Sequence, residues 1–504
     1  MKKYVMCTIF LLILILSMGF ISAQDLNDTS QSISDNVNEV TIDDSDLLSA
    51  SPKSFSDLEK DLPTYYDNVT EFNISNDYAY IEEIDSNATI LLLLGGNELT
   101  INGNNHSIDG KNQLSGFMVW AGNVTFNDLT FINCKEFWIQ GLASNIFLNN
   151  VTFIDDEGDS DKKVFVNVMG QCNLTVKNCS FYSTTNHKAD ILGALYSNVV
   201  IEDSTFTGGR VDYGNILAPY GCNLYVDNST FTNLYSRYAA AIYCEGVECI
   251  IRNSKFMNLK SNFTAGAVGI KFPSIGEFEQ TPIYLIENCI FENTSSSKDA
   301  GAIFFDSLGM GGFSIIYENI TVDIISSTFN NCSSNFGGAI LHLWGILNIV
   351  DSTFMNNRAT SAGGAIYTSC ADLNIINSNL TNNVADYQAG AIFFDEGNLT
   401  ISNSRLIGNE VTYSAIKNAA NTIYAYDANV TFEDSLFNNS GLSVIGFFSD
   451  FEDINTTFVN DELSTNNTEY EFFVARDAIT LELINNTIDV DSLPSRFDLR
   501  DGDG

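Results

Sequence analysis

A four-residue phrase of the form Asn/Asp-x-x-Phe recurs about a dozen times between residues 123 and 440. Its second position is usually Ser or Cys, and alternating apolar residues precede it. The commonest interval between copies is 25 or 26 residues. A nearly constant period of this length indicates a solenoid, because one repeat cannot bury its apolar side alone and must stack on its copies. The clearest copies end on Phe131, Phe153, Phe181, Phe206, Phe231, Phe256, Phe291, Phe329, Phe354, Leu380, Leu406 and Phe437.

A second phrase, rich in Gly and Ala and ending in Ile or Val, recurs in the same coils. Gly permits a bend between sheets, Ala fits where the coil is narrow, and the final β-branched residue suits a strand that faces the core. We therefore expect like residues to stack on like. The copies are 239–242, 265–268, 300–303, 337–340, 363–366 and 389–392.

Pairs of asparagines follow several of the closing Phe or Leu residues. Asn tolerates left-handed backbone dihedrals, and stacked amide side chains can form hydrogen-bonded ladders. These pairs predict bends that repeat from coil to coil. They are Asn330–Asn331, Asn356–Asn357, Asn382–Asn383 and Asn438–Asn439.

These patterns predict an all-β fold, a parallel β-helix of about a dozen coils over residues 88–445. At about 4.8 Å per coil its length is roughly 60 Å. Leucine-rich repeats share the period but need a Leu-x-x-Leu-x-Leu spacing that is absent here, and propeller blades are longer. Before the coils, Ser54 to Leu62 predicts a short amphipathic helix with Ser54 and Asp57 as a capping box. We expect this helix to cover one end of the stack.

The two ends of the chain suggest further segments. Residues 1–23 have a signal peptide's basic start, apolar run and small residues, and predict export. Residues 24–53 are acidic and aperiodic, typical of a disordered linker, while 54–87 are expected to form the N-terminal cap. Residues 446–492 are assigned to a C-terminal cap or linker. No second apolar stretch of about 18 residues occurs, so we expect no membrane span after signal removal.

The formal charge is -40, from 23 Lys and Arg against 63 Asp and Glu. Nucleic acids bind clusters of basic residues, so this balance argues against a nucleic-acid partner. It suits an acidic, solvated surface outside the cell.

No pattern of catalytic or metal-binding residues stands out. His106, His187 and His342 are interpreted as turn, loop or ladder residues, and the acidic run 155–161 as a solvated loop because it lacks the register of an EF-hand. We expect no catalytic residue, no metal and no cofactor.

Of the ten cysteines, nine follow the predicted signal peptide. Cys172, Cys179, Cys222 and Cys289 occupy matching repeat positions and are expected to act as small buried hydrophobes. Cys244 and Cys249 could form a local bridge.

Some twenty Asn-x-Ser/Thr sequons occur, and on an exported chain several can carry glycans. Turns rich in Asn, Ser and Thr also contain such sequons through their composition alone, whether or not a glycan is attached. The candidate positions include Asn68, Asn123, Asn228, Asn319 and Asn455.

Several motifs together resemble those of the adhesin-like surface proteins of methanogenic archaea. They are the phrases at 55–58 and 77–80, the segment 99–110 (LTINGNNHSIDG) and the Gly-Gly-Ala-Ile coils that follow. The coil phrases alone occur in many pectin-lyase-like β-helix proteins. The resemblance implies that the helix is right-handed, which the spacing itself does not fix.

Residues 493–501 (LPSRFDLRD) resemble the opening of a mature papain-like cysteine peptidase domain. In that family the nucleophilic Cys, the His and the Asn come later in the sequence, and 493–504 contain none of them. The resemblance implies an architecture of β-helix followed by peptidase, of which this segment is a truncated start.

The sequence thus predicts a non-catalytic, secreted or cell-surface adhesin-like protein. Its expected partners are extracellular glycans or cell-surface proteins, bound on sheet faces and on the lengthened loops at 260–282 and 306–323. The alternatives are a polysaccharide-active β-helix enzyme and the N-terminal part of a split or truncated cysteine peptidase.

Overall fold

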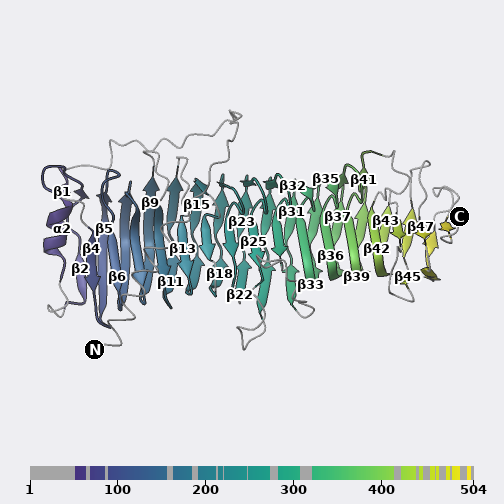
Figure 1. Ribbon diagram of the computed structural model, residues 1–504, viewed down its shortest axis with the longest axis horizontal. Coiled ribbons are helices and arrows are strands. Elements are labelled where there is room, and N and C mark those ends of the chain that lie inside the picture. The colour runs from purple at the N-terminus through teal and green to yellow at the C-terminus, as the bar shows by residue number, and fades with distance from the viewer. Residues whose placement is uncertain are drawn as a thin grey trace, which may run out of the picture. The chain divides into compact units, whose positions relative to one another are not determined.

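The computed structural model describes residues 51–500 except 64–68, 86–88, 156–162, 184–190, 212–213, 219–220, 247, 273–281, 307–319, 414–421, 439–441, 446–453, 460, 465–472, 477–478 and 489–496. Residues 1–50 and 501–504 also lie outside the described residues. In the unit from residue 50 onward, strands follow one another along a single axis (Figure 1). All pairings between the described strands are parallel, and the described residues contain one short helix. The predicted fold, a right-handed parallel β-helix of about a dozen coils, is confirmed.

Each coil passes through three strand positions, eight of the described coils add a fourth, and each position forms one ladder along the axis. The first ladder contains the strands that follow the Gly/Ala-rich phrase. It comprises β4 (Ile90–Leu93), β6 (Phe117–Trp120), β8 (Phe137–Leu142), β10 (Val164–Met169), β13 (Leu192–Leu195), β17 (Ile216–Ala218), β21 (Ile242–Cys244), β25 (Val268–Lys271), β29 (Ile303–Asp306), the starts of β33 (Ile340–Val350), β36 (Ile366–Ile376), β39 (Ile392–Ser402) and β42 (Ile423–Glu433), and β44 (Leu442–Ile445), β47 (Phe473–Arg476) and β50 (Phe497–Arg500).

The second ladder contains the alternating apolar strands that precede the Asn/Asp-x-x-Phe phrase. It comprises β2 (Glu71–Asn73), the starts of β5 (Glu98–Asp109), β7 (Asn123–Ile132) and β9 (Asn145–Asp155), β11 (Asn173–Lys177), β14 (Asn198–Glu202), β18 (Asn223–Asp227), β22 (Glu248–Arg252), β26 (Ile283–Glu287), β30 (Thr321–Ile325), the ends of β33, β36, β39 and β42, β45 (Ile454–Val459) and β48 (Ile479–Ile484).

The third ladder carries the closing Phe or Leu. It comprises β3 (Tyr78–Ala79), the ends of β5, β7 and β9, β12 (Ser180–Ser183), β15 (Thr205–Gly208), β19 (Thr230–Thr232), β23 (Lys255–Met257), β27 (Ile290–Glu292), β31 (Thr328–Asn330), β34 (Thr353–Met355), β37 (Asn379–Thr381), β40 (Arg405–Ile407), β43 (Leu436–Asn438), β46 (Glu462–Ser464) and β49 (Thr487–Ile488).

The fourth ladder is a separate sheet of eight short strands. It comprises β16 (Arg210–Val211), β20 (Tyr235–Ser236), β24 (Lys260–Ser261), β28 (Ser295–Ser296), β32 (Ser333–Phe336), β35 (Arg358–Ala362), β38 (Val384–Ala385) and β41 (Glu410–Val411).

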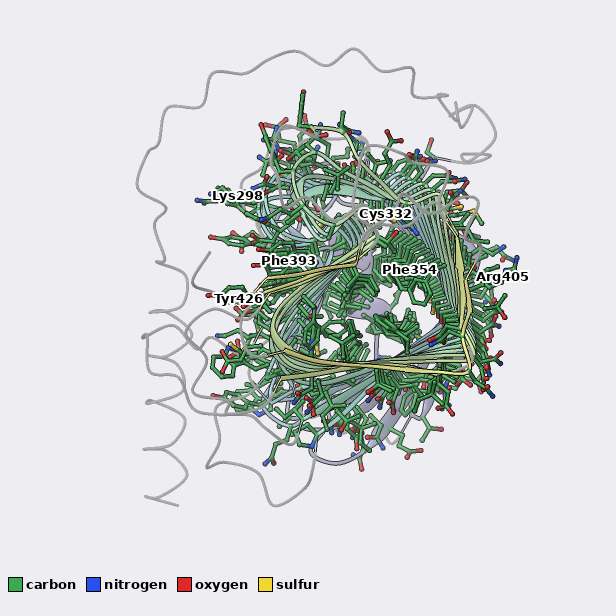
Figure 2. The ribbon with its side chains drawn as sticks, turned by 90° about the vertical axis from the view of Figure 1, so that its right-hand side faces the viewer. Lys298, Cys332, Phe354, Phe393, Arg405 and Tyr426 are labelled. Atoms are coloured by element: carbon green, nitrogen blue, oxygen red, sulfur yellow. The ribbon has the colours of Figure 1, made fainter. Side chains whose placement is uncertain are left out.

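The closing phenylalanines form a continuous stack inside the coils, as Figure 2 shows around Phe354. From Phe153 to Phe354 the ring centroids of neighbours are 4.5–4.9 Å apart and their planes lie within 8° of parallel. Coils of 35 and 38 residues keep the same stacking as coils of 25 residues, because their Phe-bearing strands pair in the same register. Each stacked pair adds about 0.5–1.5 kcal/mol beyond the burial of its rings.

The Ser at the second position of the Asn/Asp-x-x-Phe phrase forms a column of hydrogen bonds that runs along the axis just inside the coils. Ser229 donates its hydroxyl to the carbonyl of Asp227 at 2.8 Å and accepts the Ser204 N–H at 3.2 Å. This explains the preference for Ser, because one hydroxyl satisfies two backbone groups at a buried bend. Equivalent N–H donations from the preceding coil reach Ser204, Ser254, Ser327, Ser352, Ser378, Ser404 and Ser435.

Asparagines occupy the bends for the reason the sequence suggested. Asn356 and Asn382 have positive φ values of 56° and 54°, in the left-handed region that Asn tolerates. The next residue, Asn357 or Asn383, is buried, and the Asn357 amide donates to the Asn383 carbonyl oxygen at 2.9 Å. In the pair Asn330–Asn331 the residue with positive φ is the second one, Asn331. The buried position therefore falls on Cys332.

Glycine is required where neighbouring coils come closest. A Cβ atom on Gly301 would lie 1.8 Å from the Gly338 carbonyl oxygen, and one on Gly364 would lie 2.0 Å from that of Gly390. The carbonyls of consecutive Gly/Ala phrases therefore occupy the space that a side chain would need. This close approach, more than backbone flexibility, explains why the phrase is conserved from coil to coil within the chain.

The N-terminal helix α2 (Phe55–Asp61) begins where the capping box predicted. Ser54 accepts the Asp57 N–H at 3.2 Å and donates its hydroxyl to the Asp57 carboxylate at 2.8 Å. Phe55 is fully buried and packs edge-on against Phe117 of β6, with ring centroids 6.5 Å apart. The helix therefore covers the apolar end of the coil stack.

The ladders extend beyond the range of 88–445 expected for the coils. Before it, β2 and β3 pair with β5, and after it β45 to β50 continue the pairing. Phe497–Arg500, in the segment that resembles the start of a peptidase, forms β50 and pairs in parallel with β47. Periodicity missed these strands because the Phe and Gly/Ala phrases weaken there. Residues 1–23 and most of 24–53 lie outside the described residues.

The Gly364→Ala variant tests the close approach of the coils. We expect it to lower the free energy of unfolding by about 1–3 kcal/mol, because a Cβ there would overlap a backbone carbonyl that cannot move alone. The measurement is denaturant unfolding followed by circular dichroism. Gly269→Ala is the control, since its Cβ would meet the Ala239 Cβ at 3.3 Å. Equal stability of Gly364→Ala and wild type would contradict this packing.

Candidate functional site: an outer aromatic face

The residue after the final Ile of the Gly/Ala-rich phrase faces outward, and in three consecutive coils it is aromatic. Tyr367, Phe393 and Tyr424 are partly exposed and pair in register across β36, β39 and β42. Their ring centroids are 4.7 and 5.3 Å apart, with interplanar angles of 10° and 5°. We name this row the outer aromatic face. Figure 2 shows Phe393 on the side of the coils opposite Arg405.

The same row continues toward the N-terminus with a less regular composition. Leu341 pairs with Tyr367, and Phe304, Gly269 and Tyr243 occupy the row in the preceding coils. Phe336 at the end of β32 packs edge-on against Tyr367, with ring centroids 5.5 Å apart. The row of aligned positions therefore runs along the first ladder over seven coils, although Gly269 has no side chain and Leu341 is buried.

A polar row runs beside the aromatic one, two residues further along each strand. Ser369 donates its hydroxyl to the Asp395 carboxylate at 2.9 Å, and Tyr426 follows Asp395 in register. Burial raises the pKa of Tyr367, and the nearby Asp395 carboxylate adds to this. The Tyr367 phenol therefore keeps its proton at neutral pH and can donate a hydrogen bond.

This arrangement favours binding of an amphipathic ligand. Because the rings are stacked on one another, they present their edges to solvent, next to hydroxyl and carboxylate groups. Tyr in particular offers an apolar body with a polar tip. Sugars carry hydroxyl groups around apolar C–H surfaces, and so match a strip in which apolar edges alternate with hydrogen-bonding groups.

The structure places the predicted sequons in different settings. Asn123 lies in a ladder of amides on the second ladder, where its Nδ2 donates to the Glu98 carboxylate at 3.0 Å. Asn228 is exposed and its Nδ2 donates to the Asp203 carboxylate at 2.7 Å. Asn68 and Asn319 lie outside the described residues, and for Asn455 the structure describes the backbone of β45 alone. A glycan on Asn123 or Asn228 would replace one of these N–H donors, and glycosylation stays a prediction.

The two histidines that the structure describes, His106 and His342, lie apart. The His106 imidazole lies 3.2 Å from the Asp77 carboxylate at the N-terminal end of the stack, and His187 lies outside the described residues. His342 is fully buried inside the coils between Phe305 and Thr368 on the first ladder. Neither of its ring nitrogens has a hydrogen-bond partner, and burial lowers its pKa to about 3.

The acidic run at 155–161 differs from a solvated loop at its first residue. Asp155 at the end of β9 is fully buried and pairs with the equally buried Lys163, with Nζ and Oδ1 3.0 Å apart. Lys163 also donates to the Asn112 side chain at 2.5 Å. The expectation of a solvated loop is therefore wrong for Asp155, because a cation from beyond the run neutralises it. Residues 156–162 lie outside the described range.

No group of three His, Cys, Asp or Glu side chains in the described segments is placed to hold a metal ion. The nine cysteines after the predicted signal peptide are described as free thiols, and eight of them are buried. Cys172, Cys179, Cys222 and Cys289 are at most 1% exposed, as their repeat positions indicated. Cys244 and Cys249 are unbridged.

The lengthened loops lie largely outside the described residues, as 273–281 and 307–319 do. Their described flanks belong to the ladders, in β24, β25, β29 and β30.

The comparisons with known proteins give one family match. A model described as the Chlamydia polymorphic membrane protein repeat matches residues 351–369. The matched segment contains one closing Phe, one Asn pair and one Gly-Gly-Ala-Ile phrase, and it ends just past Tyr367. No curated protein matches the chain. No solved structure matches it either. In the part of the chain that the structure describes, no helix has the length and apolar character needed to cross a membrane.

Sequence reasoning missed the outer aromatic face. Its signal was present as an aromatic residue at a fixed position after the Ile of the Gly/Ala phrase, in 366–367, 392–393 and 423–424. Strand alternation would have placed that residue outside the coil.

Replacing the buried His342 imidazole by an apolar side chain tests whether the imidazole lacks hydrogen-bond partners in the fold. We expect His342→Leu to raise the free energy of unfolding by about 1–3 kcal/mol at pH 7.5, because a buried polar group without partners is removed. The pKa in the fold, about 3, lies below the ordinary 6.5. Wild type should therefore lose stability as the pH falls from 6.5 toward 3, by about 2.7 kcal/mol at pH 4.5, and the variant should lose less. Thermal unfolding at both pH values measures this; parallel curves for the two proteins would contradict it.

Proposed function

We propose that this chain is an exported, non-catalytic, adhesin-like cell-surface protein that binds extracellular glycans or surface proteins along its coils. The observation that carries the proposal is the outer aromatic face, where Tyr367, Phe393 and Tyr424 stack in register and remain partly exposed. Exposed aromatic side chains in a row beside hydroxyl and carboxylate groups favour recognition of an extended ligand.

The repeat match supports a location at the cell surface. Residues 351–369 are similar to a repeat of a polymorphic membrane protein, and this repeat contributes Tyr367 to the outer aromatic face. The signal-like residues 1–23 support export, and the formal charge of -40 suits a solvated surface outside the cell. The resemblance to adhesin-like proteins of methanogens supports the same role.

Glycan-array binding with the full chain tests this function. We expect wild type to bind a subset of glycans, and Phe393→Ala to weaken that binding about tenfold, since the loss of one central aromatic contact costs about 1.4 kcal/mol. Phe147→Ala is the matched control, because Phe147 is an aromatic side chain on β9 with an exposed fraction of 40%. The control should bind within twofold of wild type.

Three outcomes would contradict the proposal. The first is the absence of binding to every glycan and to intact cell surfaces. The second is an equal loss in Phe393→Ala and Phe147→Ala, which would indicate nonspecific adhesion. The third is the release of reducing ends or unsaturated sugars from a bound polysaccharide by wild type, which would replace the adhesin by the enzyme alternative.

A further inference from the structure

Four cations gather at one corner of the coils, where the fourth ladder turns toward the first. Arg210, Lys260 and Lys298 are exposed, and Arg237 is partly buried. Their coils are consecutive, spanning β16, β20, β24 and β28. We name this group, with its aromatic neighbours Tyr235, Tyr238 and Phe263, the basic–aromatic corner. Figure 2 shows Lys298 pointing away from the coil stack.

Aromatic rings hold each arginine of the corner and one of the lysines. The Arg210 guanidinium lies 4.7 Å from the centre of the Tyr235 ring. The Arg237 guanidinium lies 5.4 Å from Tyr238 and 5.2 Å from Phe263, and the Lys298 ammonium lies 4.4 Å from Phe263. Cation–π contact uses the flat face of a guanidinium and leaves its N–H edges available for hydrogen bonds.

These four cations differ from most others on the coils, because they form no ion pair with any described residue. Elsewhere, Lys177 pairs with Glu202, Arg252 with Glu287, Lys271 with Glu245 and Arg358 with Asp386. The contrast is marked in a chain of charge -40, where carboxylates outnumber cations almost three to one. Four positive charges that lie close together on such a surface, with no carboxylate partner among the described residues, make a local site for an anion.

The carboxyl groups nearest the corner do not neutralise it fully. Asp299 follows Lys298 and is partly buried. Burial raises its pKa to about 6; Asp306 adds to the shift and Lys298 opposes it. Asp299 therefore carries less than a full charge in mildly acidic surroundings, and within the described part of the corner the four cations outnumber Asp299 and Asp306.

The cations form two short rows along the axis. Arg210, Tyr235 and Lys260 are paired in register on consecutive strands, so two cations stand two coils apart with a ring between them. Arg237, Phe263 and Lys298 repeat the arrangement in the adjoining bends. Two coils correspond to roughly 10 Å. A ligand that follows either row would meet positive charge once in every two coils, and the two rows are offset by one coil.

We propose that the basic–aromatic corner binds an acidic polysaccharide that carries carboxylates on alternate sugars and lies along the coil axis. This inference rests on the proposed function, because it names the ligand class for a second part of the same surface. The guanidinium groups bind carboxylates by paired hydrogen bonds, and the rings between the cations contact the intervening neutral sugars.

Charge density favours such a glycan over nucleic acid. Double-stranded DNA carries about one charge per 1.7 Å of its axis, far more than four cations over two to three coils can neutralise. The remaining phosphates would meet an acidic surface. A glycan with sparse charges matches the cation spacing, and screening over about 8 Å at physiological salt limits its repulsion by more distant carboxylates.

The test measures binding of the full chain to immobilised hyaluronan, whose carboxylates lie on alternate sugars, with alginate, neutral dextran and single-stranded DNA as comparisons. We expect hyaluronan to bind and dextran not to bind. The double variant Arg237→Gln/Lys298→Gln should weaken hyaluronan binding at least tenfold and reduce its dependence on salt. The matched control is Lys255→Gln/Arg405→Gln, which removes two exposed cations from the third ladder. This control should stay within twofold of wild type.

The outcomes separate this inference from the proposed function. If wild type binds glycans through Phe393 but the corner variant behaves as wild type, the corner inference is wrong and the adhesin proposal stands. Failure to bind both hyaluronan and alginate, or equal losses in the corner and control variants, also overturns the inference. Binding of DNA as tightly as hyaluronan at the same salt would show a nonspecific polyanion site instead. Circular dichroism of each variant establishes that the coils remain folded.

Discussion

The structure depends on one constraint, the register in which each coil lies on the next. Parallel pairing joins every backbone group of the ladders to its neighbours along the axis, and this fixes which side chains meet. Phe231 can stack on Phe256 at 4.9 Å only if the strands that carry them are aligned residue by residue. The serine ladder, the buried Asn357–Asn383 contact and the close approach at Gly364 need the same alignment. A slip of one residue would turn the Phe out of the core and disrupt all of these contacts.

Much of the interior could be predicted from the sequence, because each interior position has one physical requirement that few residue types meet. The stacked Phe, the Asn with positive φ and the Gly at the close approach of two coils each recur in a repeated sequence phrase. The helix at 55–61 has a complete capping box. Where the requirement is weak, the prediction failed. Beyond residue 445 the strands pair without the phrases, and β50 is formed by residues that resemble another domain.

The exterior was harder to predict because it depends on contacts between coils that are distant in sequence. The basic–aromatic corner joins residues from 210 to 298, and each cation alone looks like an ordinary surface charge. Stacking converts such scattered residues into rows with the spacing of the coils. The same rigidity that fixes the core therefore gives the surface a regular, extended character, which suits an extended ligand.

Distance measurement by electron paramagnetic resonance tests the central claim most directly. Spin labels would be placed at Lys177 and, in turn, at Glu287, Val350 and Ser402, which follow it by four, six and eight coils on the second ladder. Cys370 would be replaced by Ser, because among the cysteines that the structure describes it is the one that is not buried. Aligned coils predict distances that rise linearly with coil number, by about 4.8 Å per coil, to roughly 19, 29 and 38 Å. Distances that follow the number of intervening residues, or that fail to rise from one pair to the next, would contradict the stacked-coil account.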